Sequence, residues 1–490
     1  MRIRNLLILL ALAGCAVQPK YAPRPPATRP PSAPAQPAPT PPAAAEAPPL
    51  VRPPTTSGDQ VFDAWAADFY PRAIKAGIKP EVFLREFAGL TPDPRVASLD
   101  TRQPEFSKPV SQYIEGVVTE GRTGVAIAKR ADVPQFDQIE QTYGVPREIL
   151  MGVWAMETGF GAIQGDFDVI RSMATLAAQG RRRGWAESEL IDALKIIQSG
   201  ECARSQLHGS WAGAMGQTQL IPSMFLSTAV DGDGDGRRDI WGSPADALAS
   251  AANLLAKAGW VRGQSWAREV TAPAGFDWSL SEGPKLTPAE WATKGVVRAD
   301  GLPWNDIDET AQAQLVAPSG ASGPAFLLFP NHFVIRRYNN SLAYALAVGL
   351  LADRFSGMGP LVRPWPAETP LSLADRMTAQ RALAALGFDP GAPDGVVGLK
   401  TRAALRGWQQ ARGLTADGYL SAQTVQRLKA ETEPQFSAPV PIPAQPAAAA
   451  PASPQPTLAS PPIRPSARGP QSSTPTPEPA QDPPAEAPRS

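Results

Sequence analysis

The sequence is poor in cysteine and histidine and has no excess charge of either sign. Its 490 residues include two cysteines, Cys15 and Cys202, and two histidines, His208 and His332. Two histidines so far apart in sequence do not form the clustered ligand set of a zinc hydrolase. Lysine plus arginine and aspartate plus glutamate balance at 46 each, so the chain lacks the basic excess that drives nucleic-acid binding. We therefore predict no nucleic-acid partner.

The apolar run near the N-terminus is too short to span a bilayer as a helix. Residues 6–13 are apolar and follow Arg2 and Arg4, as in a secretory signal. The run ends in LAGC, which resembles a lipobox, where bacterial lipoproteins are cleaved and lipidated on the new N-terminal cysteine. Ala16 comes next, whereas Asp there is the usual cue for inner-membrane retention. We predict an outer-membrane lipoprotein facing the periplasm and anchored through Cys15; the alternative is an ordinary secretory signal.

With Cys15 used for the anchor, Cys202 has no partner for an intrachain disulfide. Proline, by contrast, is abundant, with 56 residues that are concentrated at both ends of the chain. Residues 16–58 and 433–490 have too few large apolar side chains to offset the entropy of ordering them. We predict a disordered tether and a disordered tail, with the folded part between them.

One carboxylate lies on the apolar face of a predicted helix. Residues 144–146, GVP, are typical of a helix start, and Gly159 is a natural stop. Ile149, Val153 and Glu157 follow one another at four-residue steps along one stripe. A carboxylate there is costly unless it is paired or its pKa rises, and a raised pKa suits a general acid for a glycosidic oxygen. A structural pair with a buried arginine is the alternative, and periodicity alone leaves both open.

Four ordered motifs resemble those of the membrane-bound lytic murein transglycosylase B family. They are GVPREILMGVWAMETGFG, RRRGW, GSWAGAMGQTQLIPS and RYNNS, the last with Tyr344 beyond it. The resemblance covers roughly residues 60–355. It implies a mainly α (α+β) fold for residues 59–358, with a lysozyme-like catalytic core and helical and small mixed subdomains.

The resemblance implies that Glu157 is the sole catalytic residue, first as acid and then as base. The bond cut is the β-1,4 link between N-acetylmuramic acid and N-acetylglucosamine in peptidoglycan. The muramyl 6-hydroxyl takes the place of water as nucleophile, so a 1,6-anhydromuramyl end forms. The reaction needs no cofactor. Because this hydroxyl is already tethered to the sugar, its high effective molarity replaces a positioned water. The implied substrate-binding residues are Ser210, Gln217, Gln219, Tyr338, Asn339, Tyr344, Arg181, Arg182 and Trp185. Two departures occur: Gln217-Thr218 replaces an aromatic residue and glycine, and Trp185 replaces a tyrosine.

An acidic loop begins after Val230 and resembles the start of an EF-hand loop. Aspartates stand at its positions one, three and five, and Gly236 at six. The usual glutamate at twelve is replaced by Gly242, and the family resemblance implies that a later aspartate closes a longer loop around a structural Ca²⁺. The implied ligands are Asp231, Asp233, Asp235, the carbonyl of Arg237 and Asp246. A solvated acidic turn is the alternative.

Residues 368–432 contain an internal repeat. Asp394-Gly395 precedes Thr401, and Asp417-Gly418 precedes Thr424 at the same spacing. Each unit is typical of a turn followed by a helix. The pattern resembles the small three-helix peptidoglycan-binding domain of cell-wall enzymes, which would hold the catalytic domain on its polymer. A helical bundle without a ligand is the alternative.

The sequence leaves two other functions open and predicts one local feature. A hydrolytic muramidase would also use Glu157 but leave reducing ends, and a non-catalytic scaffold would only bind peptidoglycan through the second module. Around Pro330-Asn331, residues 326–329 and 333–337 are rich in aromatic and β-branched side chains and predict a small hairpin.

Overall fold

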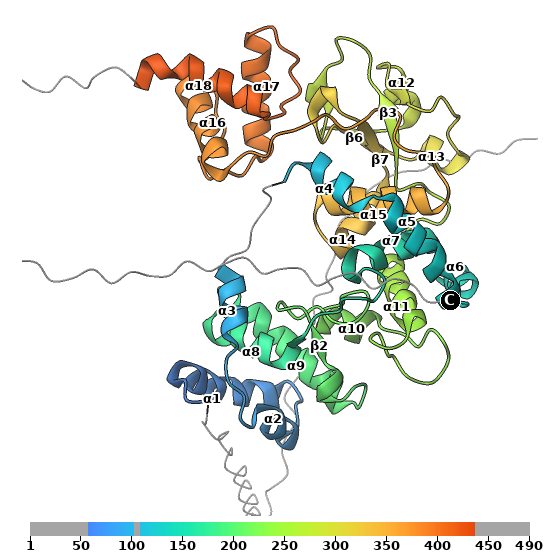
Figure 1. Cartoon of the computed structure of the whole chain (residues 1–490), viewed down its shortest axis with the longest axis vertical. Coiled ribbons are helices and arrows are strands. Elements are labelled where there is room, and N and C mark those ends of the chain that lie inside the picture. Colours follow the sequence, from blue (N-terminus) through green and yellow to red (C-terminus); the bar gives the residue numbers. More distant parts are fainter. Residues whose placement is uncertain (1–56, 102–107, 437–490) are drawn as a thin grey trace, which may run out of the picture.

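The structure is a computed structural model that describes residues 57–101 and 108–436 (Figure 1). The predicted lipobox lies outside these residues, as do residues 16–56 of the predicted tether and residues 437–490 of the predicted tail. Within the described ranges, no helix combines the length and apolarity needed to cross a membrane.

Helices dominate the first part of the chain, which confirms the mainly helical prediction. They are α1 (Gln60–Lys75), α2 (Pro80–Phe87), α3 (Pro94–Thr101), α4 (Val110–Val117), α5 (Glu120–Lys129), α6 (Phe136–Tyr143), α7 (Arg147–Thr158), α8 (Val169–Gln179), α9 (Arg183–Gln198), α10 (Pro222–Thr228), α11 (Pro244–Lys257), α12 (Pro288–Ala292), α13 (Asp306–Thr310), α14 (Pro330–Tyr338) and α15 (Leu342–Phe355). Short 3-10 helices are η1 (Arg130–Asp132), η2 (Arg204–Gln206), η3 (Trp278–Leu280) and η4 (Gly320–Ser322).

A small antiparallel sheet forms the mixed subdomain, in the strand order β4-β6-β7-β3-β5. Its strands are β3 (Ala267–Thr271), β4 (Lys285–Leu286), β5 (Val297–Arg298), β6 (Ala313–Val316) and β7 (Ala325–Leu328). A separate two-residue pair, β1 (Phe167–Asp168) with β2 (His208–Gly209), lies beside α8. We call the part of the chain from α1 to α15 the catalytic lobe, after the predicted catalytic core. Figure 1 shows the five-stranded sheet at the opposite end of this lobe from α1 and α2.

The predicted hairpin is half wrong. The first strand exists as β7, but it pairs with β6 and β3 rather than with the residues that follow it. Those residues form α14, in which Pro330 occupies the first turn. Proline presets the helical φ there, and the helix buries Asn331, Val334 and Ile335 together. Helical spacing of the buried residues therefore prevails over the β propensity of the segment.

Three hydrophobic cores stabilise the described residues, and each contains a fully buried tryptophan. Trp154 lies in the large helical core, Trp291 in the core of the sheet subdomain and Trp408 in the C-terminal module. Burying such a side chain contributes about 2–3 kcal/mol. The large core also includes Val316, Phe326 and Leu328 of the sheet, so the sheet packs one face on the helices and encloses the second core on the other.

The catalytic helix predicted from the sequence, α7, packs closely against α15. At Gly152 the backbones approach so nearly that a Cβ atom would lie 2.7 Å from the carbonyl oxygen of Val348. Only glycine permits this approach. The crossing brings Tyr344, at the start of α15, next to Glu157, at the end of α7.

The C-terminal module is the predicted three-helix unit, formed by α16 (Leu373–Ala385), α17 (Leu399–Ala411) and α18 (Ala422–Phe436). Its two Asp-Gly turns are built alike, because both glycines have positive φ, 77° at Gly395 and 73° at Gly418. In the first turn, Gln380 Oε1 accepts the Gly395 N–H at 2.8 Å. In the second, Gln409 Oε1 accepts the Gly418 N–H, also at 2.8 Å.

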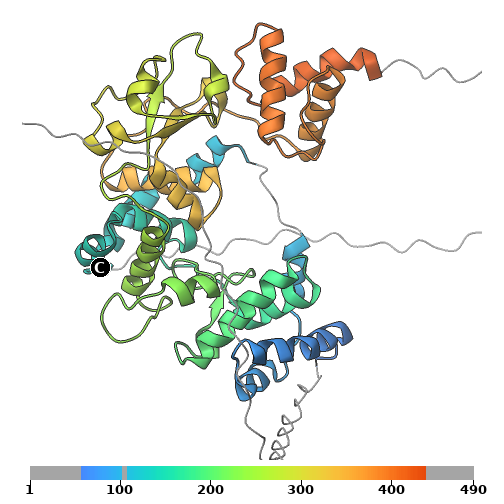
Figure 2. The same cartoon turned by 180° about the vertical axis from the view of Figure 1, so that it is seen from behind.

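The segment that joins the two modules is tied down along its length. Glu269 accepts the N–H groups of Val362 and Arg363 at 2.7 and 2.8 Å. Farther along, the carboxylate of Glu368 accepts hydrogen bonds from three hydroxyls, which come from three different parts of the fold: Ser111 on α4, Ser319 before η4 and Tyr419 in the module. The module accordingly lies beside the sheet subdomain in both views (Figure 1, Figure 2).

Candidate active site

Glu157 lies at the end of α7, where Gly159 terminates the helix with φ 59°. Protein encloses its carboxyl group almost completely, although part of the side chain remains open to solvent. The Tyr344 hydroxyl donates a hydrogen bond to Oε1 at 2.5 Å. Burial raises the pKa of Glu157 to about 7, and the Tyr344 hydrogen bond opposes that rise. The carboxyl can therefore hold a proton near neutral pH and also release it.

Two predicted tyrosines lie on either side of the turn between α14 and α15. Tyr344 is 5% exposed, and burial followed by the charge of Glu157 raises its pKa well above the ordinary value, so it stays protonated as a donor. Tyr338 donates its hydroxyl hydrogen to the Thr218 carbonyl, and the charge of Glu157 also raises its pKa after burial. Asn339 caps the end of α14 with an exposed side chain.

A third tyrosine of the site, Tyr113, was not predicted. It projects from α4, and burial followed by the charge of Glu157 raises its pKa. The positive charge of Arg122 opposes this rise in the pKa of Tyr113. The Arg122 guanidinium lies 3.8 Å from the sulfur of Met156. The helix α4 carries none of the recognised motifs, so the sequence offered no signal for this neighbour.

Ser210 and Gln219 belong to a tight loop that runs beside α7. The Ser210 Oγ accepts the Ala214 N–H at 3.1 Å, which closes the turn of the loop. Gln219 has a positive φ of 53°, and its Nε2 donates to the carbonyls of Gln164 and Gly216, both at 3.0 Å. Gln164 follows α7, so Gln219 ties the loop to the segment after Glu157.

Gln217 lies beneath the surface, with 5% of it exposed. Its Oε1 accepts the indole N–H of Trp154 at 3.1 Å, and its Nε2 donates to the Trp241 carbonyl at 3.2 Å. Its backbone carbonyl accepts the Thr158 hydroxyl at 2.6 Å. Both amide atoms thus contact protein rather than the open side of the site. The structure gives Gln217 a supporting position next to α7 and Glu157, and its predicted contact with sugar stays a prediction.

The predicted arginines and Trp185 form a cluster at the exposed start of α9. The guanidinium carbon of Arg182 lies 4.5 Å from the Trp185 ring centroid and 5.9 Å from that of Trp211, next to Ser210. Arg181 donates to the Asp100 carbonyl at 2.6 Å. Flat aromatic faces with nearby cations suit sugar rings and the carboxylates attached to them.

Four predicted metal ligands come together in the acidic loop. One carboxylate oxygen from each of Asp231, Asp233, Asp235 and Asp246 lies within 4.8 Å of the others. Asp246 is fully buried and accepts backbone N–H groups, whereas Arg237 donates its own N–H to Asp235 at 2.8 Å. Clustered carboxylates repel one another unless a cation lies between them, and oxygen ligands of this kind suit Ca²⁺.

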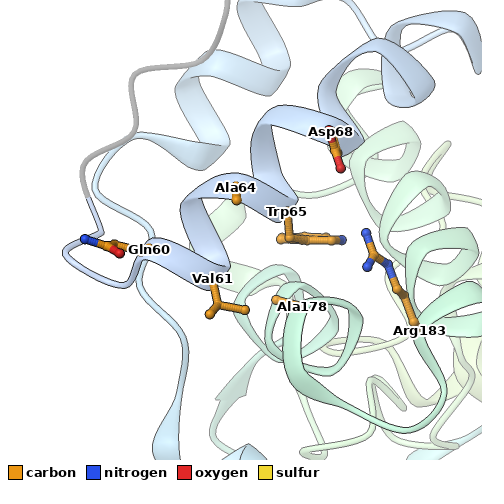
Figure 3. Close-up of a pocket in the computed structure, with 7 residues that line it drawn as sticks. All are labelled: Gln60, Val61, Ala64, Trp65, Asp68, Ala178 and Arg183. Carbon is orange, nitrogen blue, oxygen red and sulfur yellow. The ribbon is translucent and has the colours of Figure 1, made fainter.

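A hollow in the surface lies elsewhere, between α1, α8 and α9 (Figure 3). It is lined by Gln60, Val61, Ala64, Trp65, Asp68, Ala178 and Arg183. Glu187 fixes this region by accepting from Trp65 at 2.9 Å and from Arg183 at 3.0 Å. No predicted site residue lines the hollow, so it is not the candidate active site.

Comparison with protein families defines the class of this chain. Residues 61–353 match the family described as a transglycosylase SLT domain, and residues 372–428 match a putative peptidoglycan binding domain. The first match covers more than half of the chain, which therefore belongs to the transglycosylase SLT family. Both matches lie inside the predicted modules, whose limits at 59–358 and 368–432 stay predictions.

Individual relatives narrow this class. The chain is 33% identical over 215 residues to membrane-bound lytic murein transglycosylase B of Escherichia coli (strain K12); the match covers 44% of this chain and 58% of that protein, so it spans just over half of the relative's length. It is 47% identical to SltB3 from Pseudomonas aeruginosa in complex with NAG-anhNAM-pentapeptide, with a TM-score of 0.72 over 76% of this chain and 100% of that one. Escherichia coli Slt35 in complex with calcium is 26% identical, with a TM-score of 0.52 over 61% and 93% of the two chains. These similarities confirm the predicted family and its lysozyme-like fold.

Proposed function

We propose that this protein is a lytic transglycosylase that cuts the β-1,4 bond between N-acetylmuramic acid and N-acetylglucosamine in peptidoglycan. The observation that carries the proposal is the state of Glu157. Its carboxyl group is enclosed at the end of a buried helix, and burial raises its pKa to about 7. Membership of the transglycosylase SLT family supports it, as does SltB3, a relative that binds a NAG-anhNAM-pentapeptide.

In the first step, protonated Glu157 gives its proton to the bridging oxygen as the glycosidic bond breaks. The ionised carboxylate then takes the proton of the muramyl 6-hydroxyl, whose oxygen bonds to C1 and closes the 1,6-anhydro ring. The proton that leaves the enzyme in the first step returns to it in the second, so no water is consumed. A pKa near the working pH suits a group that serves in turn as acid and as base, and Tyr344 stabilises the ionised form.

The surroundings of Glu157 favour this single-carboxylate route over hydrolysis. Hydrolytic glycosidases place a second carboxylate roughly 5–9.5 Å from the acid. Burial and the Tyr344 hydrogen bond account for the pKa of Glu157, without any contribution from another carboxylate among the described residues. Tyrosines surround the group instead, which offer flat faces and hydroxyl donors to a sugar but no base to activate water.

The other predicted residues take supporting parts in this proposal. Ser210, Gln219 and Asn339 contact the sugars on either side of the cut bond, and the Arg182–Trp185–Trp211 cluster binds the glycan or its peptides. The C-terminal module holds the polymer. Lipidation of Cys15 anchors the protein in the outer membrane, and the membrane-bound relative supports an anchor. Loss of lipid labelling and of membrane fractionation in Cys15→Ser tests this part.

We also propose that the acidic loop binds a structural Ca²⁺, which a calcium-bound relative supports. The ion would neutralise the four clustered carboxylates without taking part in the reaction. Ca²⁺ at about 1 mM, a concentration near the dissociation constants of extracellular calcium sites, should raise the melting temperature of the protein. Asp233→Asn should abolish that increase. An equal increase with Mg²⁺ or with the variant would exclude a specific calcium site.

The decisive experiment is digestion of purified peptidoglycan, followed by mass spectrometry of the released muropeptides. Anhydro products, lighter by one water than reducing-end muropeptides, are expected from the wild type and not from Glu157→Gln. The exposed Glu115 provides a matched control, since Glu115→Gln should leave cleavage unchanged. Reducing-end products would identify a hydrolase, and an unchanged Glu157→Gln variant would move the catalyst elsewhere.

A further inference from the structure

The second Asp-Gly turn of the C-terminal module is occupied by a segment of the catalytic lobe. Asp417 Oδ1 accepts the Tyr419 N–H within its own turn. Its Oδ2 accepts the N–H of Ala321, in η4, at 2.9 Å. This second oxygen therefore accepts a hydrogen bond from a peptide N–H that lies outside the module. We call an Asp-Gly turn with such an acceptor a peptide receptor.

The segment in that receptor has a particular shape. Gly320, which precedes Ala321, has a φ of 68°, and an L-configured Cβ there would lie 2.5 Å from Asp417 Oδ2 and 2.7 Å from the Tyr419 Cβ. The turn thus accepts a residue with positive φ that lacks an L side chain, followed by a donated N–H. Glycine meets both conditions.

The first turn repeats the same receptor, but nothing in the described part of the chain occupies it. Asp394 Oδ1 accepts the Val396 N–H at 2.8 Å, as Asp417 does with Tyr419. The Asp394 Oδ2 atom has no hydrogen-bond partner within residues 57–101 and 108–436, and the side chain is exposed. The repeat therefore leaves one copy of a peptide receptor open.

The face around the open receptor is apolar. Leu373, Val396 and Leu399 are 55%, 64% and 66% exposed. The side chains of Leu373 and Met377 lie beside Gly395, whereas the side chain of Arg406 lies beside Gly418 in the second turn. Arg406 and its neighbour Arg402 pair with Glu282 of the catalytic lobe, at 3.7 and 2.6 Å. The open copy thus offers aliphatic side chains where the occupied copy offers a charged one. We name Leu373, Asp394, Val396 and Leu399 the open face.

We propose that the open face binds the peptide stem of peptidoglycan through a D-alanine residue, an inference that takes its ligand class from the proposed function. D-residues adopt positive φ readily, and the methyl group of D-alanine takes the place of the other glycine hydrogen, away from the aspartate. The N–H of the following residue donates to Asp394 Oδ2, and the methyl group packs against the aliphatic side chains. The module therefore recognises the D-configuration of the stem peptide and not the sugars of the glycan.

The test uses the full chain with Glu157→Gln, to keep the polymer intact, and Cys15→Ser, to keep the protein unlipidated. Its binding to insoluble sacculi is competed with a synthetic stem pentapeptide that ends in D-Ala-D-Ala. The same peptide ending in L-Ala-L-Ala controls for stereochemistry, and a chitin oligosaccharide controls for glycan. We expect competition from the D-peptide alone. This arm needs no change in the module, so its outcome does not depend on whether a substituted module folds. The second arm then assigns the competition to the module rather than to the Arg182–Trp185–Trp211 cluster.

A second arm changes the open face itself. Val396→Ser with Leu399→Ser should weaken binding to sacculi about tenfold or more, since two aliphatic contacts are lost. Leu302→Ser removes a leucine of similar exposure, 60%, from the catalytic lobe and should have no effect. Equal competition by both peptides, competition by the oligosaccharide alone, or unchanged binding of the double variant would overturn the proposal.

These outcomes are separable from failure of the proposed function. With Glu157 restored, the double variant should still form anhydro ends on a soluble glycan that lacks peptides. A wild-type chain that forms no such ends, yet is displaced from sacculi by the D-peptide, would refute the enzyme activity and leave the open face standing.

Discussion

Glu157 and Glu368 are both enclosed between structural elements, and each meets a tyrosine hydroxyl, but they are held in opposite ways. Within the described residues Glu157 accepts a single hydrogen bond, from Tyr344, and burial raises its pKa to about 7. Glu368 accepts hydroxyls from three parts of the fold. A buried carboxyl with one donor keeps access to its protonated form, and the three hydrogen bonds of Glu368 join separate segments of the fold.

The difference extends to what fixes each group in space. Glu368 is fixed by its own bonds, but Glu157 is fixed by bonds that its neighbours make. Trp154 and Thr158, on either side of it along α7, both bond to Gln217. Hydrogen bonds of the adjacent residues fix the position of Glu157. Its own carboxyl oxygens therefore make few structural hydrogen bonds and can contact a substrate.

The largest expected effect is a pH-dependent loss of folding free energy caused by the buried carboxyl of Glu157. Its folded pKa of about 7 lies above the ordinary 4.5, so this carboxyl contributes full stability below pH 4.5 and loses it as pH rises through 7. Glu157→Gln should therefore be more stable than the wild type at pH 8 by up to about 3 kcal/mol, and equal to it at pH 4. Urea unfolding at both pH values measures this, and equal stability at pH 8 would mean that the pKa is not raised.

The supporting role of Gln217 is the next largest. Gln217→Met keeps the volume but removes both amide bonds, which should lower the free energy of unfolding by about 2 kcal/mol and lower kcat with little change in KM. The exposed Gln410 on α17 provides the control substitution Gln410→Met. A raised KM with unchanged kcat would instead support direct contact of Gln217 with sugar.

Glu368→Ala should loosen the junction between the modules. Three hydroxyls lose their acceptor, so we expect a loss of about 1–2 kcal/mol in the contact between module and lobe, with faster proteolysis within residues 359–371. Cleavage of a short soluble glycan should not change. Glu309→Ala, at an exposed position of α13, is the control, and equal proteolysis of the two variants would show that Glu368 is not a tie.

The smallest effect concerns the single donor to Glu157. Tyr344→Phe removes the hydrogen bond that lowers the pKa of Glu157, so the pKa should rise further. The alkaline limb of the kcat profile should move to higher pH, by up to about one unit. Tyr143→Phe, on α6, controls for loss of a tyrosine hydroxyl. A limb that moves to lower pH would contradict the assignment.

Much of this could be predicted from the sequence because the signals are local. The apolar stripe on α7 and the glycine after it predict both the helix and the orientation of Glu157, since helical periodicity and positive-φ glycines act within a few residues. The Asp-Gly repeat predicts the module for the same reason. EF-hand-like spacing predicts Asp231, Asp233 and Asp235, the family resemblance adds Asp246, and the fold brings the four together.

What the sequence did not reveal depends on contacts between distant segments. Tyr113 approaches Glu157 only because α4 packs against α15, and no pattern within α4 records that packing. The buried position of Gln217 likewise depends on Trp241, in another loop. The strand predicted at 333–337 was wrong because β propensity describes single residues, whereas burial on α14 involves positions spaced along a helix.

The absence of a side chain at Gly152 keeps the donor to Glu157 in place. Since a methyl group there would press on Val348, Gly152→Ala would push α15 from α7 and carry Tyr344 away from Glu157. A buried glycine therefore affects the proton affinity of the proposed catalytic carboxyl through the crossing of two helices inside the protein core.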